Sequence, residues 1–380
     1  MRQNDGFFKL FLFFALAFLV LIFTTLGASA GKSSEPTVSA KAAALYEPSS
    51  GRFLYTKNEN ERLEMASTTK IMTALVASER LDPEERVTIP DIAIGTEGSS
   101  AYFKEGEELS VKELLLALML RSANDASVAL AVHTSGSTED FALLMNERAK
   151  SLGLTDTNFK NPHGLPDEDH YTTAHDLAVI SAAALENPLI RQIVATPKAT
   201  VQSSVAERVF LNHNKLLYLY DGCVGVKTGF TKAAGRCLVG AAERDGVRLI
   251  SVTLNAPNDW SDHQRLLDFG FSITENRMIA RSGDDFNYSL PVLGSDTSRV
   301  AVKLRGDVSA VLLKTDTSLT SEVILDRFIV APKNIGDQVG EVIFKLDGVE
   351  IAREKLVLSE SAPLVKKKGF FAKIKEFFIK

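Results

Sequence analysis

The order of strand-like and helical segments constrains the fold of this chain more than any other feature. Two short alternating segments, residues 42–46 and 52–56, flank a turn-rich connector and predict a hairpin. Residues 71–189 then have mostly helical spacing. Strand character returns in three later segments, residues 222–228, 237–242 and 248–254. This order favours an α+β domain, an antiparallel sheet with a helical insertion, over a doubly wound parallel sheet.

Local signals support these elements. Ser110 and Glu113 form a predicted capping box ahead of an apolar helix, and Thr173 precedes another helix as a predicted cap. The dipeptide at 245–246, Asp-Gly, predicts a tight turn between the last two strands. We expect a helix over residues 263–271 to close the domain.

A second domain is predicted after residue 286. Short alternating segments occur there, at residues 300–304, 308–314, 341–345 and 349–358, and an Asp-Gly turn lies at 347–348. We therefore expect a main domain over 31–285 and a small all-β domain over 286–362. The second domain has no evident catalytic chemistry.

The N-terminus has the features of an export signal. Arg2 and Lys9 precede an apolar run over residues 10–26, and Ala28-Ser29-Ala30 is a small-residue cleavage pattern. Residues 1–30 are predicted to be a signal peptide cleaved after Ala30. The alternative is an uncleaved membrane anchor, since the run approaches the length that spans a bilayer. Either interpretation predicts that the rest of the chain leaves the cytoplasm.

Composition excludes several functions. The formal net charge of -5 gives no overall attraction to nucleic acid, so we expect no nucleic-acid partner. The six histidines have no metal-ligand spacing, and no cofactor or catalytic metal is predicted. Cys223 and Cys237 are too few for a disulfide scaffold, and the sequence leaves open whether they pair across a hairpin or stay as buried thiols.

The first chemical motif is Ser67-Thr68-Thr69-Lys70, at the start of an apolar helical stretch. Residues three apart share a helix face, so the Lys70 amine can reach the Ser67 hydroxyl. A helix N-terminus disfavours a cation, and a lysine neutralised there could take the serine proton. The simpler interpretation is that Ser67 caps the helix and Lys70 is solvated. The spacing alone proves little, because Ser29 and Lys32 repeat it.

Two further motifs follow in order. Ser122-Ala123-Asn124 comes directly after an apolar helix, and Lys227-Thr228-Gly229 lies within a strand pattern. Each alone could be structural, as a helix-ending turn or an exposed strand end. Three such motifs in this order, on a helix, a loop and a strand, are poorly explained by coincidence.

The ordered set resembles the serine penicillin-recognising enzymes, with their Ser-Xaa-Xaa-Lys, Ser-Asp-Asn and Lys-Thr-Gly motifs. Within them the chain is similar to the serine-type D-alanyl-D-alanine carboxypeptidases, the low-molecular-weight penicillin-binding proteins. Residues 120–126, 161–165 and 221–230 also match that family. The resemblance covers about residues 40–271 and, in outline, the β domain and basic tail. Ala123 replaces the middle Asp, as is usual in these carboxypeptidases.

The resemblance implies catalytic roles for four residues. Ser67 would attack the carbonyl between the two terminal D-alanines of a peptidoglycan pentapeptide, and would likewise be acylated by β-lactams. Lys70 would accept its proton. Ser122 would relay a proton to the leaving D-alanine, and Asn124 would hold Lys70 and the substrate amide.

The resemblance also implies binding roles on the third motif. Lys227 and Thr228 would bind the terminal carboxylate, and the strand beyond Gly229 would lie along the substrate backbone. The N–H groups of Ser67 and Phe230 would form the oxyanion hole. A side chain at Gly229 would obstruct this close approach.

Two other functions are weighed against a carboxypeptidase. A class A β-lactamase needs a Glu-Xaa-Xaa-Leu-Asn pattern between the second and third motifs, and none is present; the nearest string, 322–326, lies beyond Lys227 and ends in Asp. A catalytically inactive wall-binding protein would lack a chemical residue, and none is missing.

The C-terminal segment, residues 363–380, predicts an amphipathic helix. Its apolar residues share one helical face: Phe370, Phe371, Ile374, Phe377 and Phe378. Lysines border them, at Lys366, Lys367, Lys368, Lys373, Lys375 and Lys380. This mixture is typical of an interfacial anchor on anionic lipid, which predicts a peripheral enzyme on the outer face of the cytoplasmic membrane. The alternative is a helix docked on the β domain.

Overall fold

The computed structural model describes residues 35–365. The expected signal peptide and the expected helix over 366–380 therefore lie outside the described residues. The α+β class is confirmed by a central antiparallel sheet with strand order β2-β1-β9-β8-β7. Its strands are β1 (Ala42–Glu47), β2 (Arg52–Lys57), β7 (Cys223–Thr231), β8 (Gly235–Arg244) and β9 (Val247–Leu254).

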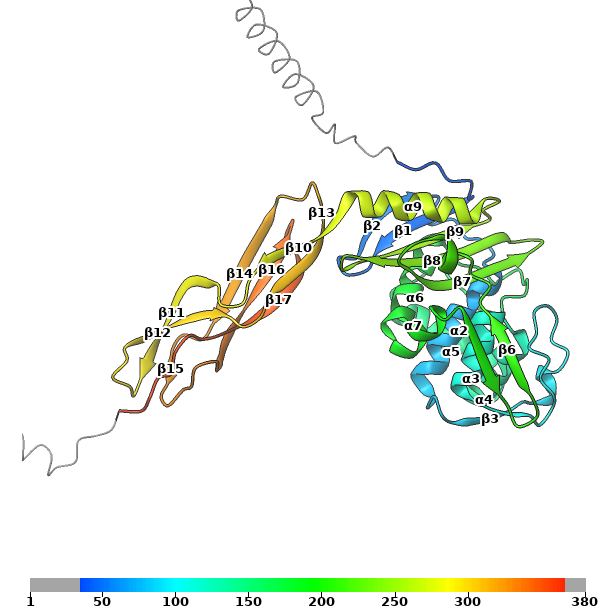
Figure 1. Ribbon diagram of the computed structural model, residues 1–380, viewed down its shortest axis with the longest axis horizontal. Helices are drawn as coiled ribbons and strands as arrows, with labels where there is room; N and C mark the ends of the chain where they lie inside the picture. Colours follow the sequence, from blue (N-terminus) through cyan, green and yellow to red (C-terminus); the bar gives the residue numbers. More distant parts are fainter. Residues whose placement is uncertain (1–34, 366–380) are drawn as a thin grey trace, which may run out of the picture. The chain divides into compact units, whose positions relative to one another are not determined.

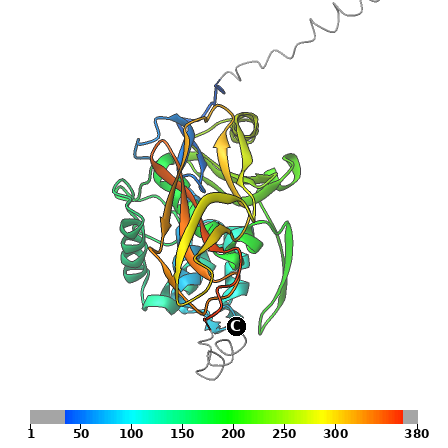
Figure 2. The same ribbon diagram turned by 90° about the vertical axis from the view of Figure 1, so that its left-hand side faces the viewer.

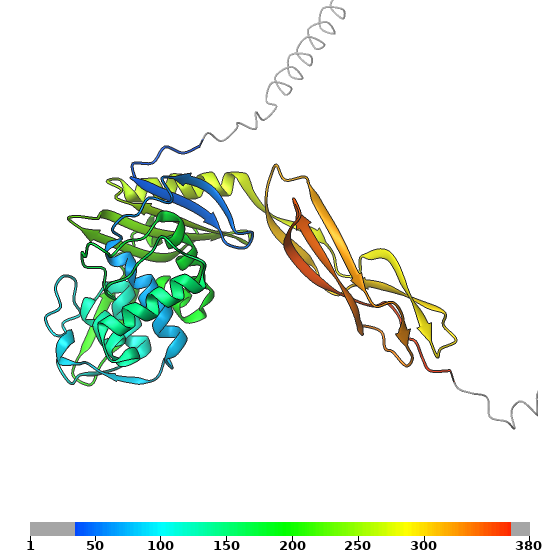
Figure 3. The same cartoon turned by 180° about the vertical axis from the view of Figure 1, so that it is seen from behind.

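Helices cover both faces of this sheet (Figures 1 and 3). On one face lie α2 (Lys70–Arg80), α6 (Ala174–Glu186) and α7 (Pro188–Val194), and on the other lie α8 (Leu216–Leu219) and α9 (Asp259–Ile273). Three more helices pack on α2, α7 and one another: α3 (Val111–Leu116), α4 (Asn124–Ser135) and α5 (Thr138–Ser151). Ala42 and Ala44 of β1 face the core shared with α2 and α6, whereas Ala43 and Leu45 face the core under α9. Because successive side chains of β1 point to opposite faces of the sheet, this strand contributes to the apolar cores on both faces.

The predicted caps and turn are confirmed. Ser110 accepts a hydrogen bond from the Glu113 amide, whose side chain accepts one from the Ser110 amide. Thr173 accepts from the amide of Asp176 at the start of α6. The β8–β9 turn has positive φ at Asp245 (50°) and Gly246 (77°), the conformation that an Asp-Gly hairpin turn needs.

Four short strands interrupt the region between β2 and β7. They are β3 (Arg86–Thr88), β4 (Glu108–Ser110), β5 (Lys198–Gln202) and β6 (Glu207–Leu211), and they pair as β3–β4 and β5–β6. The mostly helical interpretation of residues 71–189 missed the first pair. Strands of three residues are too short to produce a readable alternation.

The second domain is β-rich, as expected (Figure 2). Its larger sheet has the order β14-β16-β17-β12-β11-β15, and β10 pairs with β13. The strands are β10 (Thr274–Ala280), β11 (Asp285–Leu293), β12 (Arg299–Leu304), β13 (Val308–Leu313), β14 (Leu319–Leu325), β15 (Ile329–Val330), β16 (Gln338–Leu346) and β17 (Val349–Leu358). The expected boundary at residue 286 falls inside β11. The β-rich elements begin at Thr274, because β10 follows α9 directly and pairs with β13.

Two further features concern the cysteines and the membrane. Cys223 and Cys237 are unpaired, because the β7–β8 register places them opposite Ala242 and Gly229 rather than opposite each other.

Within residues 35–365 no single helix has the length and hydropathy to cross a bilayer. The bent pair formed by α6 and α7, at 107°, is the one combination there that passes by length and composition.

Candidate active site

Ser67 lies in a 3-10 turn, Ala66–Thr69, directly before α2. No side chain caps either element, so the interpretation of Ser67 as a helix cap is wrong. Ala66 has a φ of 47°, which is uncommon for a residue with a side chain. The backbone therefore bends sharply just before Ser67, and Ser67 lines a cavity.

Lys70 is completely buried, so the interpretation of its side chain as solvated is wrong. Its Nζ lies 3.1 Å from the Oγ of Ser67, 2.6 Å from the Oδ1 of Asn124 and 2.6 Å from the carbonyl oxygen of His163. The predicted contact between Ser67 and Lys70 is thus present. It joins the first motif to Asn124 of the second.

Burial lowers the pKa of Lys70 well below its usual value, and the positive charge of Lys227 lowers it further. Asp125 opposes part of this effect. Lys227 is itself buried, and burial lowers its pKa to about 7. Two desolvated amines near one another favour loss of a proton, which is what a base at this site requires.

The second motif forms the turn between α3 and α4. A π-helical turn, Ala117–Arg121, leads into Ser122, which adopts a left-handed conformation with φ 64°. Asn124 begins α4, and its backbone N–H donates to the carbonyl oxygen of Ser99 at 2.7 Å. Ser122 and Ser99 both line the cavity at Ser67.

The third motif lies on β7, which packs against the Ser67 turn. A Cβ added at Gly229 would lie 3.0 Å from the Ser67 amide nitrogen and 3.1 Å from the Met65 carbonyl oxygen. This close approach explains the glycine. Thr228 and Phe230 line the cavity, whereas Lys227 is buried and its Nζ donates to the Thr228 carbonyl at 2.9 Å.

The cavity at Ser67 has a volume of about 620 Å³. It also contains residues that the sequence did not indicate, among them His213, Arg236, Asp259 and Trp260. Arg236 lies opposite Phe230 in the β7–β8 register and forms an ion pair with Asp259 at 2.8 Å. No local motif marks these residues, since the strand register and the start of α9 bring them together.

The loop that contains residues 161–165 packs against the backbone just before Ser67. Gly164 has φ 87°, and a Cβ there would lie 1.9 Å from the Ala66 carbonyl oxygen. The Lys160 amide donates to Nδ1 of His170 at 3.0 Å, so the imidazole proton lies on Nε2, 2.8 Å from the Thr69 hydroxyl. Thr69 in turn donates to the Ala66 carbonyl at 2.8 Å. This chain of hydrogen bonds fixes the strained residue before Ser67.

Replacing Thr69 with valine is therefore expected to lower kcat by about tenfold or more, if Ser67 carries the reaction, because a displaced Ser67 hydroxyl loses its near-attack geometry. Thr69→Ser keeps the hydroxyl and should keep most of the activity. The measurement is kcat and melting temperature for both variants. If Thr69→Val lowers the melting temperature but leaves kcat unchanged, the hydrogen-bond chain serves stability alone.

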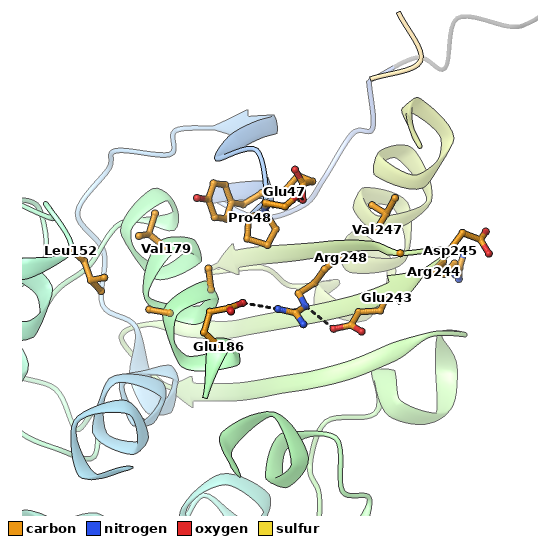
Figure 4. A pocket seen from close by; sticks show the side chains of 15 residues that line it. Glu47, Pro48, Leu152, Val179, Glu186, Glu243, Arg244, Asp245, Val247 and Arg248 are labelled. Atoms are coloured by element: carbon orange, nitrogen blue, oxygen red, sulfur yellow. Dashed lines mark hydrogen bonds and ion pairs between the residues drawn. The ribbon is translucent and has the colours of Figure 1, made fainter. Parts of the chain in front are cut away.

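A second cavity, of about 700 Å³, lies between α6 and the β8–β9 turn (Figure 4). Arg248 is held there by Glu186 at 2.9 Å and by Glu243 at 2.6 Å. Its charge is matched by these carboxylates, and none of the three motifs contributes to the lining. The smaller cavity at Ser67 is therefore the candidate active site. Within residues 35–365 no group of three His, Cys, Asp or Glu side chains could hold a metal.

Comparisons with known proteins agree over most of the chain. Residues 29–258 match the family model described as D-alanyl-D-alanine carboxypeptidase, and residues 275–363 match that of the C-terminal domain of penicillin-binding protein 5. The D-alanyl-D-alanine carboxypeptidase DacF of Bacillus subtilis is 34% identical over 90% of this chain and 90% of its own length.

Solved structures give the same result. The structure of penicillin-binding protein 5 from Haemophilus influenzae is 29% identical, covers 87% of this chain and 99% of its own, and has a TM-score of 0.65. A peptidoglycan synthesis regulatory factor, PBP3, from Streptococcus pneumoniae is 25% identical, covers 86% and 100%, and has a TM-score of 0.73.

Proposed function

Since this chain belongs to the D-alanyl-D-alanine carboxypeptidase family and is a serine hydrolase of that class, we propose that it works through an acyl-enzyme formed on Ser67. Peptidoglycan stem peptides as substrates and β-lactams as ligands fit this family. Of the residues assigned to its steps, Ser67, Ser122 and Phe230 line the cavity, and Lys70 and Asn124 are buried.

One observation carries this assignment, namely the set of partners around the Lys70 amine. The Oδ1 of Asn124 and the carbonyl oxygen of His163 can only accept hydrogen bonds. A neutral amine has two N–H groups for these two acceptors and one lone pair left. The third neighbour, Ser67, has a hydroxyl that can donate to that lone pair. The site therefore suits a neutral Lys70 that accepts the serine proton.

The reaction follows from this arrangement. Ser67 Oγ attacks the carbonyl carbon between the terminal D-alanines while its proton moves to Lys70. The N–H groups of Ser67 and Phe230 stabilise the negative oxygen. Ser122 passes the proton from Lys70 to the leaving amine, which departs as D-alanine, and Asn124 holds Lys70. Water then attacks the ester while one of its protons passes through Lys70 to the Ser67 oxygen. The shortened peptide leaves with a free carboxyl group, and the Ser67 hydroxyl is restored.

The third motif supplies recognition of the carboxylate. Thr228 lines the cavity, and the preceding residue of β7, Lys227, is buried and supplies positive charge when it is protonated. Arg236 lines the same cavity but is paired with Asp259 at 2.8 Å, so Lys227 and Thr228 carry the proposed recognition. A substrate with a free terminal carboxylate therefore meets matched positive charge.

We expect a peptide of the diacetyl-Lys-D-Ala-D-Ala type to release D-alanine, and its C-terminal amide to react at least about 100-fold more slowly in kcat/KM. The C-terminal amide leaves protonated Lys227 without an anion, and this raises the free-energy barrier by several kcal/mol. Released D-alanine or D-alaninamide is measured for both substrates. Equal rates would refute the carboxylate role, while no release from either would refute the proposed substrate.

We also propose that the chain is exported by residues 1–30 and held on the outer face of the cytoplasmic membrane by residues 366–380. Each lysine near an anionic surface contributes about 1 kcal/mol, and four buried phenylalanines contribute several more. Together these contributions support reversible peripheral binding.

Truncation after Pro363 tests the anchor. The truncated enzyme is expected to move from the membrane fraction to the soluble fraction and to keep its activity on small peptides, because every residue assigned to the reaction lies within residues 67–230. Fractionation and D-alanine release are measured together. A truncated enzyme that stays in the membrane fraction would show that the anchor lies elsewhere in the chain.

A further inference from the structure

One end of the β-rich domain carries exposed apolar side chains. Leu293 at the end of β11 is 50% exposed, and Val330 in β15 is 56% exposed. These two residues are direct partners in the parallel β11–β15 pairing, whereas their neighbours Val292 and Ile329 lie in the core. We name as the apolar end the exposed residues Leu293, Phe328, Val330, Ile335, Leu364 and Val365.

Hydrogen bonds hold the segments of the apolar end together. The Val365 amide donates to the Gly294 carbonyl at 2.8 Å, and the Ala331 amide donates to the Leu293 carbonyl at 2.9 Å. Lys333 and Ala362 bridge the remaining two segments. In Figures 1 and 3 the described chain finishes at the end of the domain that contains β15. The apolar end is thus a built surface that includes the last described residues.

The sequence that follows is the reason to assign a partner. Val365 is followed directly by Lys366-Lys367-Lys368 and then by the phenylalanines of the expected anchor. Phe370 is five residues beyond Val365, so an extended chain allows at most about 18 Å between them. A membrane that binds Phe370 therefore lies within about 18 Å of Val365. Val365 belongs to the apolar end and is hydrogen-bonded to Gly294.

We propose that the apolar end is a second membrane-contact surface, which enters the headgroup region of an anionic bilayer beside residues 366–380. This inference rests on the proposed membrane attachment and adds a structured part to it. The flanking charges are mixed, with Asp296 and Asp326 against Arg327 and Lys333, so the apolar end supplies apolar area and the anchor lysines supply the attraction. Two linked contacts bind more tightly than one, because the second forms within the same molecule.

The first test measures binding to vesicles of phosphatidylglycerol and phosphatidylcholine. Residues 31–380 carrying Leu293→Gln and Val330→Thr are expected to bind about tenfold more weakly than the parent chain. The matched control is Ile324→Thr with Val349→Thr, two exposed strand residues of the same domain, and its binding should equal that of the parent. Release of D-alanine from a small peptide should be unchanged in both variants.

The second test places a tryptophan in the apolar end. In a Trp260→Phe background, the emission of the Val330→Trp variant should shift to shorter wavelength when vesicles are added, and that of Ile324→Trp should not. If the Val330→Trp emission is already blue-shifted without vesicles, and red-shifts after truncation at Val365, residues 366–380 cover the apolar end and the proposal is wrong. A shift that depends on protein concentration instead of vesicles would assign the apolar end to a second copy of the chain and would also overturn the proposal.

The outcomes separate the two proposals. If the parent chain binds vesicles and the variant with Leu293→Gln and Val330→Thr binds equally well, the apolar end makes no membrane contact and this inference is overturned while the anchor stands. If the parent chain does not bind vesicles at all, the anchoring proposal fails and takes this inference with it.

Discussion

Replacing Ser67 with alanine is expected to reduce D-alanine release by at least about 10,000-fold, because the acyl-enzyme cannot form without its nucleophile. The rest of the cavity should remain intact. The side chain is small and half-buried, and its hydroxyl contributes only its contact with Lys70 to the fold. The measurement is kcat/KM on the D-Ala-D-Ala peptide, with the melting temperature as a check on folding.

Ser78→Ala is the matched control, since Ser78 lies on α2 and does not line the cavity; its hydroxyl donates to the Leu75 carbonyl and accepts from the Asn187 side chain. That variant should keep parental activity. A Ser67→Ala enzyme within about tenfold of the parent would mean that another residue is the nucleophile or that water attacks directly.

Replacing Lys70 with methionine is expected to slow acylation by about 100- to 10,000-fold, the usual range for removal of a general base. Methionine has a similar length and fits a buried position without a charge. The acceptors Asn124 and His163 lose their donor, so some stability is lost as well. Acylation is followed with a labelled penicillin. A near-normal acylation rate would show that Lys70 is not the base.

The pH dependence follows from the same residue. Acylation needs the neutral amine, so kcat/KM should rise with pH through a midpoint far below the ordinary lysine value, because burial and Lys227 lower the pKa of Lys70. It should fall again above about pH 7, where Lys227 loses the charge that its carboxylate role needs. Stability should rise with pH as well. The unfolded chain binds more protons than the folded one between the lowered pKa and the ordinary one, so unfolding free energy rises with pH across that window. A midpoint at about 10, the ordinary lysine value, would contradict the assignment.

Much of the fold could be predicted because its signals are local. The Asp-Gly turn before β9 and the Thr173 cap of α6 depend on neighbouring residues alone, and both are present. The start of the β-rich domain could not be predicted in this way. Strand β10 is identified by its pairing with β13, a strand far along the chain, and no local pattern announces that contact.

In the candidate site, too, local contacts could be predicted from the sequence and long-range contacts could not. The spacing of Ser67 and Lys70 predicted their contact, since a helical turn fixes it. The burial of Lys70 could not be predicted, because it depends on how the Asn124 turn and the His163 loop close over the amine. The same holds for Arg236, which reaches the cavity through strand register, and for His170, which is linked by hydrogen bonds through Thr69 to Ala66, the residue before Ser67.

The most direct test of the central claim is to trap the acyl-enzyme and find the residue that carries it. The protein is treated with a penicillin, digested with a protease, and the peptides are measured by tandem mass spectrometry. We expect one adduct with the mass of the whole penicillin, as an ester on the Ser67 side chain, and none in the Ser67→Ala variant. An adduct on any other residue, or an unmodified Ser67 peptide under saturating penicillin, would contradict the mechanism.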